Sequence, residues 1–363
     1  MAFEPCDVPI TRWNEGRPIL APRGDGWEGG VTFNASALLL DRSPKHDAIL
    51  RRLLGSEALN DPRLANGVVA VHYRARPRRD PGFPMNRSYI GLALFTSRLE
   101  LLERFSEPVL RPEEAPDAYD TLGVEDPRIT PIDDAFVAVY CGVARDEPSG
   151  WRARVCFARS TDLLTWEKLG PVDGSLNAVN NKDGVLFPER IDGRYLLLHR
   201  PMVGPQSDWA IALASSDSLT GHWTDHGTVL RATPDPRVRE SWVGAGSVPI
   251  PLGEGRYLVL YHTGHRFDDG DRLYTTDATI FDLSRFDSTD PTRIVTARLE
   301  RLLVPETEWE RRAPFSDSVA NVVFLCGSYE LGDEIVLVYG GGDTYILAAS
   351  VRREALLDAL ESA

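Results

Sequence analysis

The feature that most constrains the fold is a motif that recurs along the chain. It consists of a strand, a serine-containing turn and an aromatic residue near the start of the next strand. Its two clear copies are Phe157–Trp166 and Leu213–Trp223, and a weaker copy covers Leu94–Phe105. The serines stand at positions 97, 160 and 215, so the repeat is roughly 60 residues long. A period of that size, with about four strands in each unit, is typical of β-propeller blades.

Short apolar segments separated by turn residues fill the chain from about residue 60 to residue 350. Dividing this region by the repeat predicts an all-β, five-bladed β-propeller over residues 31–352. Residues 1–30, which are rich in Gly, Pro and Trp, predict a short irregular N-terminal arm. The apolar spacing of residues 44–54 predicts one inserted helix, and residues 353–363 predict a C-terminal helix. Two β-sandwich domains are the alternative, but no linker divides the chain.

The charge of the chain restricts its partners. The net charge is -14 and the pI is about 5.0, which argues against nucleic acid or an anionic membrane surface as a partner. A neutral small molecule fits better. The N-terminus shows neither a basic nor an apolar leader region, so we expect a cytoplasmic protein. No histidine and cysteine spacing indicates a metal site, and a homo-oligomer remains open.

Polar segments recur about once per predicted blade. A propeller binds its ligand at one mouth of the central channel, to which the innermost strand of every blade contributes. We therefore expect these segments to meet there. They are Gly123–Thr130, Lys182–Glu189 with His199–Pro201, Glu240–Ile250 with Tyr261–His262, and Tyr339–Tyr345.

The first of these segments places two adjacent carboxylates, Glu125 and Asp126, directly before Pro127 and Arg128. Proline disfavours helix in the residue before it, so the segment predicts a bend at the start of a strand. We expect the two acidic side chains to be presented rather than packed. Taken alone, a Glu-Asp-Pro-Arg run is better explained as a solvated turn with a surface ion pair. The recurrence of polar segments in later blades favours a functional site.

Several carboxylates that converge on a neutral ligand suggest cleavage of a glycosidic bond. In that chemistry an acid protonates the leaving oxygen and a second group activates or supplies the nucleophile. We expect Asp126 to be the acid. Glu189 or Glu240 is then the candidate base toward water, in the geometry that inverts the anomeric carbon.

A second route to the nucleophile uses cations instead of a base. Lys182, Arg200 and His262 could hold a phosphate that attacks directly, because ammonium and guanidinium groups suit that anion. The residues alone leave both routes open.

Together these segments resemble glycoside hydrolase family 130, which contains β-mannoside phosphorylases and β-1,2-mannosidases. The resemblance covers most of the chain from about residue 60, with the motifs in the family's order. It implies a five-bladed propeller, inversion at the anomeric carbon, and Asp126 as the proton donor, directly or through a sugar hydroxyl. It also implies that Asp343 holds the mannosyl unit. The predicted substrate-binding residues are Asn34, Arg74, Arg128, Asp183, Trp242, Asp343 and Tyr345.

The chain departs from the family at two positions. Trp242 stands where the phosphorolytic members have a lysine before Gly-x-Gly, and Thr263 follows His262 where a glycine is common. Replacing lysine by tryptophan removes a charge from the anion site and offers a ring that could stack on a sugar. We therefore favour an inverting hydrolase of β-mannosides. The alternative is a phosphorylase that releases mannose 1-phosphate, and the second alternative is a propeller that binds glycans without cleaving them. No cofactor is expected, apart from inorganic phosphate as co-substrate of a phosphorylase.

Overall fold

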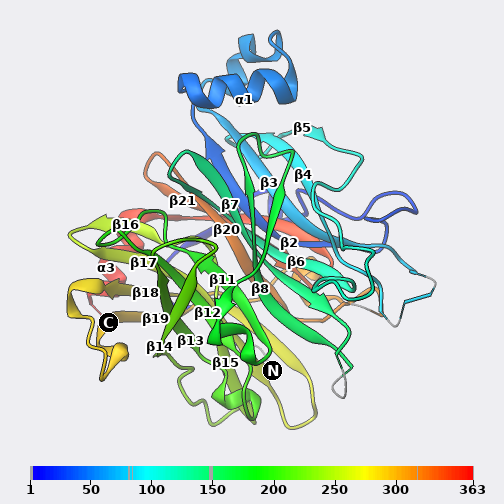
Figure 1. The fold of residues 1–363 in the computed structure, drawn as a ribbon. Helices are drawn as coiled ribbons and strands as arrows, with labels where there is room; N and C mark the ends of the chain where they lie inside the picture. The colour runs from blue at the N-terminus through cyan, green and yellow to red at the C-terminus, as the bar shows by residue number, and fades with distance from the viewer. Residues whose placement is uncertain (1–2, 81, 84, 147–149, 317, 363) are drawn as a thin grey trace.

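The fold is a five-bladed β-propeller, built from five sheets of four or five strands (Figure 1). The computed structural model describes residues 3–80, 82–83, 85–146, 150–316 and 318–362. Strands that follow one another in sequence mostly pair as antiparallel neighbours within one sheet. The predicted all-β propeller with five blades is confirmed.

In the first four blades the main strands follow one another from the innermost outward. Blade one contains β2 (Val31–Leu40), β3 (Val68–Arg76), β4 (Tyr89–Thr96) and β5 (Leu101–Arg104), and blade two contains β6 (Gly123–Ile132), β7 (Ala135–Ala144), β8 (Arg152–Ser160) and β9 (Glu167–Pro171). Blade three contains β11 (Asn181–Leu186), β12 (Tyr195–Pro201), β13 (Ile211–Ser216), β14 (His222–Leu230) and the short β10 (Asp173–Gly174), which precedes β11 but lies at the outer edge of the blade. Blade four contains β15 (Glu240–Ala245), β16 (Ile250–Gly253), β17 (Arg256–Arg266), β18 (Arg272–Asp282) and β19 (Val295–Leu303).

Both ends of the chain build the fifth blade. Its inner strands are β20 (Val323–Leu331), β21 (Glu334–Gly341) and β22 (Tyr345–Arg352), and its outermost strand is β1 (Ile10–Arg12). β1 pairs antiparallel with β22, which closes the ring of blades. The arm that we expected to be irregular over residues 1–30 therefore supplies a strand, and the propeller begins before the expected boundary at residue 31.

Helices are few and lie outside the sheets. α1 (Pro44–Leu54) matches the inserted helix predicted from the sequence and stands out from the edge of the propeller (Figure 1). Ser43 caps it and proline occupies its first turn, as helix starts favour. α3 (Arg353–Glu361) packs against blades four and five; residue 363 of the predicted helix lies outside the described residues. The short α2 (Glu308–Arg311) was not predicted. No helix in the described part of the chain is long and apolar enough to cross a membrane.

The hydrophobic core is divided among the interfaces between blades. Five main clusters of buried side chains each join two neighbouring blades, and together they run around the ring. Middle strands of the blades are therefore apolar on both faces, as Val68–Val71 of β3 illustrates with four fully buried residues in succession. Because each blade is covered on both sides, such strands read as continuous apolar runs rather than as alternating patterns.

One ion pair fastens the closing strand. Arg12 of β1 places its Nε 2.9 Å from Glu310 Oε1 of α2, and its Nη2 donates to the carbonyl of Val304 at 2.8 Å. The Glu310 side chain is fully buried. Replacing Arg12 with methionine leaves this carboxylate without its cationic partner, and we expect the free energy of unfolding to fall by about 3 kcal/mol.

Urea unfolding measures this effect. Arg17→Met is the matched control, because Arg17 pairs with Glu15 at 3.3 Å where both side chains are exposed, so its loss costs less than about 1 kcal/mol. Equal losses in the two variants would show that the buried pair does not hold the ring closed.

Candidate active site

Polar side chains from all five blades surround one mouth of the central channel. They enclose a cavity of about 150 Å³. A separate cavity at the opposite mouth is lined by residues near the ends of the same inner strands, such as Leu39, Pro131 and Tyr329. The first cavity therefore lies where the inner strands begin. Its lining residues are Phe33, Asn34, Arg74, Arg76, Asp126, Lys182, Asp183, Arg200, Tyr274, Phe324 and Asp343.

Three β-bulges direct polar side chains into this cavity. Asn34, Asp126 and Asp183 each interrupt the register of an innermost strand pair, in blades one, two and three. Their φ angles are 46°, 51° and 53°, in the left-handed region that Asn and Asp tolerate better than other non-glycine residues. A bulge changes the direction in which a side chain leaves its strand. In three of the five blades, the polar residue that faces the cavity thus has a common backbone origin.

The two adjacent carboxylates are buried rather than presented, which corrects the expectation from the sequence. Glu125 is 4% exposed and Asp126 is 3% exposed. Arg74 pairs with both, at 2.9 Å from its Nη1 to Asp126 Oδ1. Lys182 Nζ lies 2.9 Å from Glu125 Oε2 and 3.6 Å from Asp126 Oδ2. Asn34 donates from Nδ2 to Asp126 Oδ1 at 2.8 Å. Both acids can be buried because each cation serves two carboxylates.

Asp183 is the centre of a second buried group. Its Oδ2 lies 2.9 Å from Arg200 Nη1 and 3.3 Å from His262 Nε2. Its Oδ1 lies 3.6 Å from Arg128 Nη2. Arg128 also donates hydrogen bonds to the carbonyls of Ala245, at 3.0 Å, and Gly246, at 3.1 Å. Arg128, which the sequence analysis expected to bind the ligand, is 1% exposed. It instead links the inner strands beneath the cavity through these hydrogen bonds.

The protonation states follow from these contacts. Burial opposes ionisation of Asp126, but Arg74, Lys182 and Arg128 hold the pKa of its carboxyl well below the usual range. Likewise, Arg200 and His262 outweigh burial and lower the pKa of Asp183. Asp343 differs, because burial raises the pKa of its carboxyl to about 7. Asp343 thus titrates near neutral pH and lines the cavity.

The site carries an excess of positive charge in an acidic protein. Of the described residues, Arg74, Arg76, Arg128, Lys182 and Arg200 contribute five cations. Three carboxylates with lowered pKa values, those of Glu125, Asp126 and Asp183, oppose them. Asp343, whose pKa is about 7, is only partly ionised at neutral pH. Burial lowers the pKa of His262, so this residue adds no charge at neutral pH. Such a cavity attracts an anion.

The two candidate bases do not reach the cavity. Glu189 is exposed, lies beyond the end of β11, and accepts a hydrogen bond from Tyr257 at 2.7 Å. Glu240 begins β15 and pairs with Arg266 at 3.3 Å. Neither lines the cavity, because several strand residues separate each glutamate from the level at which the bulges deliver side chains.

Two predicted aromatic residues also lie elsewhere. Trp242 is 1% exposed and packs beside Trp209 and Tyr274, with ring centroids 6.3 Å and 5.6 Å away. Its ring is therefore not presented for stacking on a sugar. Tyr345 packs edge-on against Trp309, with centroids 4.9 Å apart, and does not line the cavity.

Four cavity residues were missed by the sequence analysis: Phe33, Arg76, Tyr274 and Phe324. Arg76 lies two residues after Arg74 on β3, so strand alternation could have placed both on one face. Tyr274 comes from β18 and Phe324 from the start of β20, where no motif marked them. Their rings pack against His262, with centroids 6.2 Å and 4.0 Å away, and supply the apolar wall of the cavity.

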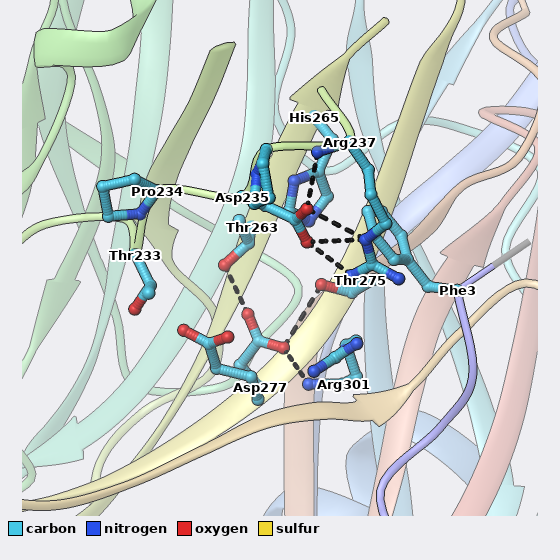
Figure 2. Close-up of a pocket in the computed structure, with 12 residues that line it drawn as sticks. Phe3, Thr233, Pro234, Asp235, Arg237, Thr263, His265, Thr275, Asp277 and Arg301 are labelled. Atoms are coloured by element: carbon cyan, nitrogen blue, oxygen red, sulfur yellow. Dashed lines mark hydrogen bonds and ion pairs between the residues drawn. The ribbon is translucent and has the colours of Figure 1, made fainter. Parts of the chain in front are cut away.

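A larger cavity, of about 320 Å³, belongs to blade four and the N-terminal arm (Figure 2). None of the predicted site residues lines it. At its base Asp277 accepts hydrogen bonds from the hydroxyls of Thr263 and Thr275 and from the backbone N–H of Arg301 (Figure 2). No described cation pairs with this buried carboxylate, and burial raises the pKa of Asp277 to about 6.

A propeller that gathers carboxylates and cations at one mouth has the architecture of an enzyme for a small polar substrate. Comparison with known proteins agrees. The model of glycoside hydrolase family 130, described as beta-1,4-mannooligosaccharide phosphorylase, matches residues 79–362. The chain belongs to this family and is a glycoside-processing enzyme.

Individual relatives extend over nearly the whole chain. A 1,2-beta-oligomannan phosphorylase of Thermoanaerobacter sp. (strain X514) is 31% identical, covering 91% of this chain and 93% of its own. A beta-1,2-mannobiose phosphorylase of the same organism is also 31% identical, covering 95% and 98%. The solved structure of the beta-1,2-mannobiose phosphorylase from Listeria innocua has a TM-score of 0.73 at 23% identity and covers 98% of this chain and all of that one.

Gly244 of β15 leaves room for the Asp183 group. A Cβ atom there would lie 2.1 Å from Asp183 Oδ2 and 2.5 Å from His262 Nε2. We expect Gly244→Ala to displace both side chains and to lower kcat/KM for β-mannoside cleavage by about 100-fold. The control is Gly26→Ala, where nothing lies within 4 Å of the added atom. Unchanged activity in both variants would show that the Asp183 group tolerates movement.

Asp277 predicts a pH effect on stability. Its pKa rises from 3.8 to about 6 on folding, so the folded state holds this proton more tightly than the unfolded chain. The free energy of unfolding then falls as pH rises through that interval, by about 3 kcal/mol in total.

Asp277→Asn removes this titration. We expect the stability of the wild type relative to the variant to decrease between pH 4 and pH 7, as measured by urea unfolding. Asp235→Asn is the control, because Arg237 lowers the pKa of Asp235 to about 2, and its contribution is lost only as pH falls. Parallel pH curves for the wild type and Asp277→Asn would contradict the assignment.

Proposed function

We propose that this protein is an inverting β-mannoside phosphorylase, which cleaves β-1,2-linked manno-oligosaccharides with inorganic phosphate and releases mannose 1-phosphate. This was the alternative in the sequence analysis, where hydrolysis was favoured. The observation that carries the proposal is the excess of cations in the cavity, combined with the position of Glu189 and Glu240 outside it. A hydrolase needs a base for water, whereas a phosphorylase needs a pocket for an anion.

The sequence analysis expected Trp242 to weaken the anion pocket, but we infer that it has no such effect. Its ring is buried behind Tyr274 and occupies no space in the cavity. The missing lysine is offset by Arg76, which lines the cavity and which the sequence analysis did not count. Lys182 and Arg200 line the cavity and remain the proposed phosphate ligands, whereas His262 is fully buried against Tyr274 and Phe324 and does not line it. Arg200 Nε has no hydrogen-bond partner in the described structure, so it has unused capacity for a polar ligand.

The names of two relatives support the β-1,2 linkage in this proposal. Two phosphorylases that are 31% identical over more than nine-tenths of the chain carry β-1,2-mannose-based substrates in their names. Those names describe the relatives, and we extend them to this chain because each match covers more than nine-tenths of it.

The proposed reaction uses groups already placed by the fold. Asp126, in its acid form, delivers a proton to the glycosidic oxygen, directly or through a sugar hydroxyl, while the bond from that oxygen to the anomeric carbon breaks. A phosphate oxygen forms the new bond from the opposite face, which inverts the configuration. The proton lost by the attacking phosphate restores Asp126. Asp343, which makes no hydrogen bond or ion pair with other described residues, is available to hold the mannosyl hydroxyls.

Product analysis tests the proposal. The protein is incubated with β-1,2- and β-1,4-linked manno-oligosaccharides, with and without inorganic phosphate, and the products are followed by ³¹P NMR and chromatography. We expect α-mannose 1-phosphate, formed only with phosphate and faster from the β-1,2-linked substrates. Asp126→Asn should lower the rate by about 1,000-fold or more. Release of free mannose from the non-reducing end at one rate in both conditions, without the phosphate ester, would contradict phosphorolysis.

A further inference from the structure

Two cations clamp the proposed proton donor in the ligand-free site. Arg74 Nη1 lies 2.9 Å from Asp126 Oδ1, and Lys182 Nζ lies 3.6 Å from Asp126 Oδ2. Both cations also contact Glu125, so they are held in place from the other side. An acid catalyst must carry a proton, yet a carboxyl in contact with two cations gives its proton up. The resting site therefore opposes the reaction that Asp126 is proposed to perform.

The remaining groups around Asp126 reinforce the clamp. Asn34 of β2 donates a hydrogen bond to the carboxylate of Asp126. Arg128 of β6 donates from its Nη1 to the backbone carbonyl of Asp126, at 3.0 Å. The other ionisable groups that line the cavity are Arg76 of β3, Asp183 of β11, Arg200 of β12, Tyr274 of β18 and Asp343 of the β21–β22 turn. Together with Arg74 and Lys182, four cations line the cavity, against the carboxyls of Asp126, Asp183 and Asp343.

We infer that the clamp of Arg74 and Lys182 determines the choice of phosphate over water as the nucleophile, because Asp126 can hold a proton only after an anion shares these two cations. This inference rests on the proposed function and names the residues that set its nucleophile specificity. Arg74 and Lys182 act through Asp126 and are positioning residues in this role.

The physical argument is a competition for charge. Lys182 lines the cavity and is partly exposed, so a phosphate can take up hydrogen bonds from its ammonium group. A divalent anion beside Arg74 and Lys182 offsets their field at Asp126 and adds a negative charge close to the carboxylate. Both effects favour the neutral acid. The carboxylate then takes one proton from solvent, passes it to the leaving oxygen, and regains it from the attacking phosphate. Water brings no charge, so it leaves Asp126 ionised.

Inorganic sulfate is the appropriate probe, because it matches phosphate in shape but stays fully ionised across neutral pH and exchanges no proton itself. Isothermal titration calorimetry of the wild type, in buffers with different ionisation enthalpies, counts the protons taken up with sulfate. Measurements between pH 5 and pH 6 suit Asp126, because Asp343 is already protonated there. We expect uptake of about one proton, and sulfate affinity that weakens about tenfold for each unit that the pH rises.

Asp126→Asn identifies the group that takes the proton. We expect this variant to lose the proton uptake, to bind sulfate with nearly constant affinity over the same pH range, and to bind more tightly than the wild type at pH 8. Glu125→Gln and Asp343→Asn are matched controls, because both residues are acids close to the same cations. Each should retain the uptake between pH 5 and pH 6. Arg200→Gln, whose partner is Asp183, should weaken sulfate binding and keep its pH dependence.

Three results would overturn the inference. They are sulfate binding without proton uptake, uptake that survives in Asp126→Asn, and uptake that disappears instead in Glu125→Gln. In each case the formation of mannose 1-phosphate would stand, so the proposed function would survive. Absence of any sulfate or phosphate binding, together with hydrolysis to free mannose, would reject the proposed function and the inference with it.

Discussion

The centre of the propeller depends on the burial of two adjacent carboxylates beside two shared cations. Arg74 comes from blade one, Glu125 and Asp126 from blade two, and Lys182 from blade three. Removing one member would leave the buried charges unbalanced, which is costly in a protein interior. The hydrophobic clusters join blades only in neighbouring pairs. The charge network instead fixes three blades about one point.

Local backbone distortions make this network possible. Regular strands alternate their side chains, so a plain inner strand cannot send two adjacent acids toward the same pair of cations. The bulge after Glu125 breaks that rule in blade two, and similar bulges serve Asn34 and Asp183. Gly244 supplies the space that Asp183 and His262 occupy. The site is therefore built from departures from ideal β-structure at corresponding places in successive blades.

The same contacts that stabilise the network also restrain its chemistry. Arg74 and Lys182 keep Asp126 ionised, which suits a buried carboxylate and does not suit a proton donor. An anion bound in the cavity contacts the same two cations and offsets their field at Asp126, so the carboxyl can then hold a proton. Stability in the resting state and reactivity with an anion bound then arise from one set of side chains. The excess of cations is thus an argument about the reaction as well as about binding.

Much of the architecture followed from the sequence. The strand–turn–tryptophan repeat predicted the blades, and apolar spacing predicted α1 residue for residue. The recurrence of polar segments predicted that Asp126, Lys182 and Asp343 would meet, and the family resemblance added Asn34 and Arg74; all five line the cavity. These signals are local or periodic, so single segments carry them. β1 escaped prediction because three residues have no measurable period, and only its pairing with β22 makes it a strand.

The tertiary structure decided what faces the cavity. Glu189 and Glu240 belong to the same motifs as the cavity residues, yet their height along the inner strands removes them from it. Trp242 is covered by neighbours from other strands, and Tyr274 and Phe324 enter from strands that carried no motif. The sequence by itself determined the family, the blades and the candidate acid. Burial, charge pairing and the direction of a side chain depend on residues distant in sequence, and only the folded chain brings those together.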